Sequence, residues 1–62
     1  MNKLVVITEI LEQFGDYNFP EDFDILKEAI ELAEYLIERS GNKLTFNEID
    51  KCIFNRYEDY LY

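Results

Sequence analysis

The chain has 62 residues, with fourteen Asp and Glu against six Lys and Arg and a formal net charge of −8. Apolar residues form 48% of it and ten residues are Phe or Tyr, which excludes an intrinsically disordered segment. Without histidine and with one cysteine, neither an internal disulfide nor the usual Cys/His zinc site can form. A chain this short makes a single domain with a small core.

The cysteine content and the N-terminal segment bear on the cellular compartment. A lone cysteine, Cys52, is typical of a reducing, cytoplasmic protein. The apolar run from Leu4 to Ile7 is shorter than the apolar region of a signal peptide, and no stretch approaches the roughly 18 apolar residues of a membrane span. The strong negative charge also disfavours binding to anionic membranes. We therefore expect a cytoplasmic protein that does not bind membranes.

Residues 3–14 form the first expected helix. Its apolar residues recur at helical spacing, and Gly15 is placed to end it. Val5 and Val6 would also suit a strand, but a lone strand would have no partner elsewhere in the chain. The pattern favours a helix whose apolar stripe consists of Leu4, Ile7, Leu11 and Phe14.

Residues 21–40 carry the clearest helical pattern, with acids opposite the apolar side. Pro20 suits the first turn of a helix, and Gly41 suits the position just after its last turn. The apolar side of this helix is broad, so we expect the helix to lie between the other two. Its stripe consists of Leu26, Ala29, Ile30, Ala33, Leu36 and Ile37.

Residues 45–61 form the last expected helix, beginning at the capping pair Thr45 and Glu48. The linker before it is short, which favours a close helix pair. The sequence predicts an all-α fold, a small three-helix bundle. Dimerisation would bury more of its apolar surface. The stripe of the last helix consists of Phe46, Ile49, Ile53, Tyr57 and Tyr60.

An acidic face on the middle helix is the main candidate partner-binding site. Between Glu21 and Glu38 there are seven acids and one base. At 1.5 Å per residue this gives about one net charge per 4 Å, close to the roughly 3.4 Å per charge of one DNA strand. The face could therefore imitate a phosphate backbone. It consists of Asp24, Glu28, Glu31, Glu34, Tyr35 and Glu38.

The alternative is that these acids form the solvated side of an amphipathic helix. Within the helix, however, the acids have almost no opposite charge at i, i+4, and the like charges Asp24 and Glu28 repel each other. Tyr35 among the carboxylates suits an interface anchor. We expect the partner of such a face to be a basic, nucleic-acid-binding protein, while the sequence leaves a purely solubilising role open.

A second hypothesis places function in the last helix, as an oligomerising or helix-turn-helix-like DNA-associated regulator. Residues 1–38 contain ten acids and two bases, whereas residues 39–62 contain four of each. Direct binding to nucleic acid is disfavoured, because six bases are few and the acidic face would repel phosphates. The bases near the last helix are Arg39, Lys43, Lys51 and Arg56.

The C-terminal aromatic residues are candidates for self-association into a homodimer. Two of them, Tyr57 and Tyr60, also lie on the expected core stripe. Tyr17 and Phe19, in the loop after the first helix, could instead fold over this edge, and the sequence leaves both arrangements open. The self-association candidates are Phe54, Tyr57, Tyr60, Leu61 and Tyr62.

The residue inventory disfavours catalysis, since one serine, two glycines and no histidine leave no nucleophile, base and oxyanion combination. No cofactor or metal is expected. In size, charge and aromatic content the chain resembles the small acidic proteins of phages and mobile elements that inhibit host nucleic-acid enzymes, such as anti-CRISPR and anti-restriction inhibitors. That resemblance implies a non-enzymatic protein-binding inhibitor, and no motif transfers a residue role.

Overall fold

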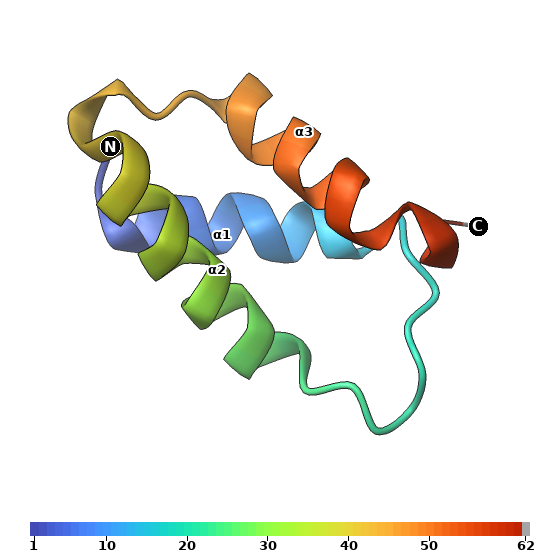
Figure 1. Ribbon diagram of the computed structural model, residues 1–62. Coiled ribbons are helices and arrows are strands. Elements are labelled where there is room, and N and C mark those ends of the chain that lie inside the picture. The colour runs from blue at the N-terminus through green and yellow to red at the C-terminus, as the bar shows by residue number, and fades with distance from the viewer. Residues whose placement is uncertain (62) are drawn as a thin grey trace.

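Three α-helices and two short 3₁₀ turns make up the computed structural model, which describes residues 1–61 (Figure 1). The helices are α1 (Lys3–Phe14), α2 (Ile25–Ser40) and α3 (Phe46–Tyr57), and the turns are η1 (Gly41–Lys43) and η2 (Glu58–Tyr60). Residues 1–61 contain no strand; Tyr17 and Leu61 form only an isolated antiparallel bridge. The predicted all-α three-helix fold is confirmed.

Each helix begins at a polar side chain that accepts a backbone hydrogen bond. Asn2 accepts from the Val5 amide at 2.9 Å, and Asp24 accepts from the Lys27 amide at 3.1 Å. Thr45 accepts from the Glu48 amide at 3.3 Å. These bonds satisfy amides that a helix start leaves without intrahelical partners. The predicted ranges 3–14 for the first helix and Thr45 as the start signal of the last are confirmed.

Two of the predicted helix ranges were too long. The second helix begins at Ile25 rather than at residue 21, because the Asp24 side chain caps it. Before it lies a turn in which the Phe23 amide donates to the Pro20 carbonyl at 3.0 Å. The last helix ends at Tyr57, where the chain tightens into η2 instead of continuing to residue 61. Thr45 therefore marked the start of the last helix correctly, whereas Pro20 placed the start of the second helix too early.

The N-terminal helix α1, not α2, is the central helix. It packs against both α2 and α3, whereas the backbones of α2 and α3 approach each other little (Figure 1). Val6 and Ile10 of α1 are completely buried. The prediction that the middle helix lies between the other two was wrong. The core consists of Val6, Ile10, Phe14, Tyr17, Ala29, Leu32, Ala33, Leu36, Leu44, Ile49, Ile53 and Tyr57.

Several residues expected in the core are exposed instead. Leu4 is 73% exposed, Leu26 is 58% and Phe46 is 51%. Leu11 and Tyr60 are exposed as well, to smaller extents. Most positions of α1 are apolar, so helical spacing is compatible with more than one apolar stripe. In the structure, the buried stripe consists of Val6, Ile10 and Phe14. An apolar residue on the surface is common in folded proteins and carries no functional meaning by itself.

The loop between α1 and α2 folds over the end of α3, which settles the arrangement left open by the sequence. The Phe19 ring stacks on Phe23 at a centroid distance of 4.2 Å and meets Tyr57 and Tyr60 at 5.4 Å each. The Asn18 amide donates to the Tyr60 carbonyl at 2.6 Å. Aromatic packing of this kind adds to the burial of apolar area. The loop therefore completes the core near the C-terminal ends of α1 and α3.

Across residues 1–61, no helix has both the length and the apolar content that crossing a membrane requires.

Candidate protein-interaction surface

The polar side of α2 presents most of the predicted acidic face to solvent. Glu31, Glu34, Tyr35 and Glu38 are all exposed, and their spacing places them along one side of the helix. Asp24 is exposed too, at the start of the helix, where one carboxylate oxygen caps the Lys27 amide. Five of the six predicted residues thus lie on an accessible surface.

Glu28 differs from the other acids because it is partly buried and bonded to α3. Its carboxylate accepts a hydrogen bond from the Tyr57 hydroxyl at 2.8 Å, and the Arg56 guanidinium lies 4.0 Å away. Tyr57 is only 6% exposed. Glu28 therefore joins α2 to α3, and Tyr57 belongs to the core rather than to an exposed self-association patch.

This contact alters the acid–base chemistry of the tyrosine. Burial, followed by the hydrogen bond to Glu28, raises the pKa of Tyr57 to about 12. The phenol consequently stays protonated, and it remains a donor to Glu28 throughout the physiological pH range.

Two other members of the face also have partners. Lys3 of α1 pairs with Glu34 at 2.9 Å. The Arg39 guanidinium donates to the Tyr35 hydroxyl at 2.8 Å and lies 5.3 Å from the ring centroid. We expected the acids of this face to be almost unpaired because the sequence shows only pairs within one helix. Lys3 belongs to a different helix, α1. Within residues 1–61, Glu31 and Glu38 have no hydrogen-bond or ion-pair partner.

The bases of the second hypothesis are partly engaged by α2. Arg39 lies on Tyr35, and Arg56 lies beside Glu28 and over the Tyr57 ring at 5.8 Å. The Tyr57 hydroxyl helps to raise the pKa of Arg56 further, so it stays cationic. Lys43 is exposed in η1, and Lys51 is exposed on α3. These four cations do not form one continuous stripe along α3.

The remaining self-association candidates are exposed to different extents. Phe54 is 48% exposed on α3, and Leu61 is also exposed. Tyr60 lies under the Phe19 ring on one side and is partly exposed on the other. Tyr62 lies outside the described residues. Cys52 packs against the core in a half-buried position.

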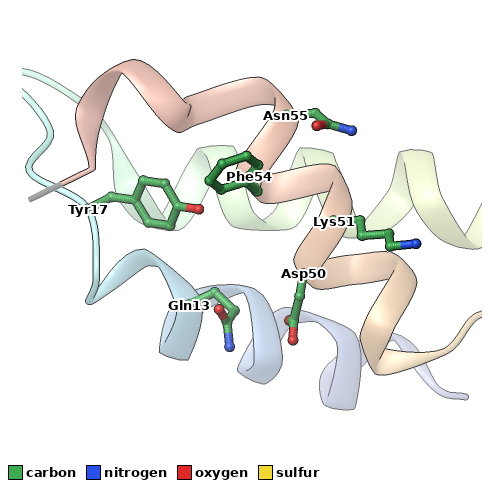
Figure 2. Close-up of a pocket in the computed structure, with 6 residues that line it drawn as sticks. All are labelled: Gln13, Tyr17, Asp50, Lys51, Phe54 and Asn55. Atoms are coloured by element: carbon green, nitrogen blue, oxygen red, sulfur yellow. The ribbon is translucent and has the colours of Figure 1, made fainter.

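A hollow between α1 and α3 was not predicted from the sequence. It is an open hollow of about 570 Å³, lined by both apolar and polar groups (Figure 2). Its residues are far apart in the sequence, and only the parallel packing of α1 and α3 brings them together. No local pattern indicates that packing, so no sequence signal could have found the site. The lining residues are Gln13, Tyr17, Asp50, Lys51, Phe54 and Asn55.

Beside this hollow, carboxyl groups from two helices lie together. A hydrogen bond with Asp50, burial, and the negative charge of Asp50 raise the pKa of Glu9. Gln13 donates to the Glu9 carboxylate at 3.1 Å. One carboxylate oxygen of Asp50, Oδ1, is buried and has no hydrogen-bond partner among the described residues. Two carboxyl groups, Glu9 of α1 and Asp50 of α3, therefore meet across the α1–α3 interface.

The substitution Asp50→Asn is expected to stabilise the protein at pH 7. A folded-state pKa raised above 4.5 means that protonated Glu9 stabilises the fold below about pH 4.5. That contribution is lost as the pH rises through the folded pKa. An asparagine removes the repulsion and donates to Glu9, so the melting temperature should rise by a few degrees at pH 7 and change less at pH 3.

Circular dichroism during heating, at both pH values, measures this effect. Asp59→Asn serves as the control, because Asp59 is an exposed acid in η2 and its replacement changes the net charge equally. A lower melting temperature for Asp50→Asn at pH 7 would contradict the interpretation. An equal gain in the control would attribute the effect to net charge alone.

Comparisons of the chain with protein-family models, with known proteins and with solved structures find no match.

Proposed function

We propose that the protein is a non-enzymatic inhibitor or regulator that binds a basic, nucleic-acid-binding protein through α2. The binding surface, here called the α2 acidic surface, consists of Asp24, Glu31, Glu34, Tyr35 and Glu38. Such a partner would be blocked because carboxylates occupy the positions that nucleic-acid phosphates take. The lone half-buried thiol of Cys52 is compatible with a cytoplasmic protein, and the size and charge resemble those of phage and mobile-element inhibitors.

The observation that carries the proposal is an exposed aromatic side chain held between carboxylates without internal partners. Tyr35 is 44% exposed, and its hydroxyl is held by Arg39. Glu31 and Glu38 lie one helical turn to either side of it. Tyrosine is enriched at binding hot spots because it supplies large contact area with few rotatable bonds. A preoriented Tyr35 would therefore lose little conformational entropy on binding.

The charge of the surface contributes mainly to the rate and specificity of encounter. Glu28 is not part of it, since that carboxylate bonds to Tyr57. Glu34 keeps an exposed ion pair with Lys3, which salt or a competing arginine can open at little energetic cost. Complementary charge accelerates association, and screening by salt slows it. Affinity for the partner should therefore decrease as the salt concentration rises.

The test uses charge reversal with a matched control. The double substitution Glu31→Lys and Glu38→Lys should weaken binding at least about tenfold, because attraction becomes repulsion at both sides of Tyr35. Glu12→Lys with Asp59→Lys changes the net charge equally but lies on α1 and η2. That control should retain most of the affinity.

The experiment captures basic proteins on the immobilised wild-type chain at low salt, then measures release of a fluorescent DNA duplex from each captured protein. The proposal requires DNA release by the wild type, reduced release by the α2 variant and near-normal release by the control. Simultaneous binding of DNA and this protein would refute steric blocking. Equal losses in both variants would show that net charge, not the α2 acidic surface, is responsible.

A further inference from the structure

The hollow between α1 and α3 is a second site with its own chemistry. None of its lining residues belongs to α2, so it is separate from the α2 acidic surface. Figure 2 shows Asp50 extending from α3 toward α1, while Tyr17 directs its hydroxyl toward the Phe54 ring. Phe54 is 48% exposed, so one part of its ring is open to a ligand.

The hollow is rich in hydrogen-bond acceptors. Asp50 brings a carboxylate. Gln13 donates its amide N–H to Glu9, which leaves its amide oxygen as an acceptor beside the hollow. The hydroxyl of Tyr17 can also accept. A ligand with several N–H donors would therefore find partners on both helices.

Several acidic groups lie near Tyr17 in the hollow, and one lysine stands at its rim. Burial, followed by the charges of Asp16, Asp50 and Glu58, raises the pKa of Tyr17. Lys51 points to the outer edge of the hollow in Figure 2, away from Asp50. Neighbouring residues on a helix do not face each other, which explains why this lysine does not neutralise that carboxylate. A cation is thus favoured over an anion.

We propose that this hollow binds the guanidinium group of an arginine side chain on a partner protein, with Asp50 as its ion-pair partner and the Phe54 ring as its stacking surface. Guanidinium is planar, stacks on aromatic faces and carries five donors in a fixed geometry. A lysine ammonium is compact and strongly hydrated, and it would use the ring and the spread acceptors less well. The inference goes beyond the function proposed for α2, and either can fail alone.

The test is an NMR titration of the full-length protein with arginine capped as the N-acetyl, N-methylamide derivative. The amide signals of Gln13, Asp50 and Phe54 should shift in a saturable manner, in the millimolar range expected for one side chain. Capped citrulline, which has the same shape without the charge, should not bind. Capped lysine should bind more weakly than capped arginine.

Variants separate the roles of the lining residues. Asp50→Asn should weaken binding of capped arginine about tenfold, because a charge-assisted hydrogen bond is lost. Phe54→Ala should weaken it about threefold, the range of an exposed cation–π contact. Glu21→Gln removes one charge from the exposed turn before α2, outside both proposed sites, and should leave the affinity unchanged. The melting temperature of Asp50→Asn, measured by circular dichroism, distinguishes a loss of binding from unfolding.

Three results would overturn the proposal. One is equal binding of capped citrulline or capped lysine, which would exclude guanidinium recognition. Another is an equal loss in Glu21→Gln, which would indicate general charge attraction. The third is tighter binding of free arginine than of capped arginine, which would identify a small-molecule site instead of a site for a protein side chain.

Discussion

Replacing Phe19 by alanine is expected to lower the free energy of unfolding by about 3 kcal/mol, as aromatic truncations in cores do. Phe19 lies in a loop, yet its ring meets the rings of Phe14, Phe23, Tyr57 and Tyr60 at centroid distances of 5.0, 4.2, 5.4 and 5.4 Å. A domain this small is stabilised by only a few kcal/mol in total. The variant should therefore be largely unfolded near body temperature.

Urea unfolding followed by circular dichroism measures this effect, and Leu4→Ala is the control. Leu4 is a large apolar residue within a helix, but it is 73% exposed. Its replacement should change the free energy of unfolding by less than about 0.5 kcal/mol. Similar, small losses in both variants would show that the loop is not part of the core.

Replacing Tyr57 by phenylalanine is expected to cost about 2 kcal/mol at pH 7. The change keeps the ring and removes the hydroxyl that donates to Glu28 at 2.8 Å. Hydrogen bonds to charged groups contribute more than neutral ones, and here the partly buried carboxylate would lose its donor. A double-mutant cycle with Glu28→Gln isolates the coupling between the two side chains.

The same bond predicts a distinct pH dependence. Because the pKa of Tyr57 is raised from 10.0 to about 12, the protonated phenol stabilises the fold fully below about pH 10. This contribution is lost as the pH rises from 10 to about 12. Wild type should therefore lose its advantage over Tyr57→Phe across that window, which urea unfolding at several pH values would detect.

Tyr35→Phe is the matched control for this pair. Its hydroxyl also has a charged partner, Arg39, but both side chains are exposed. Water replaces such a bond at little cost, so the expected change in the free energy of unfolding is below about 0.5 kcal/mol. A constant difference between wild type and Tyr57→Phe from pH 7 to 12 would contradict the assigned role of the hydroxyl.

Features set by neighbouring residues could be predicted from the sequence. Thr45 caps α3 because its hydroxyl reaches an amide three residues ahead, an interaction within one turn. Gly41 follows α2 with a φ of 55°, a conformation that glycine adopts without strain. The helical class and the start of α3 follow from such local chemistry.

Features that depend on how helices meet could not be predicted. Leu4 and Val6 are both apolar residues of α1, but only Val6 faces its neighbours, and this choice depends on the packing of all three helices. Glu28 and Glu31 lie on the same polar side of the helix in the sequence pattern. In the structure, however, Glu28 accepts a hydrogen bond from Tyr57 of α3 and joins the two helices. The hollow between α1 and α3 likewise depends on how these two helices pack, because both contribute lining residues.

The hydrogen bond from Asn18 to Tyr60 has a consequence for the kinetics of folding. It joins the loop after the first helix to the last turn, so about two thirds of the chain lies between its two ends. Contacts of such long sequence separation cost loop-closure entropy and are gained after more local ones. We expect substitutions there to accelerate unfolding more than they slow folding, so that this junction sets how long a folded molecule persists.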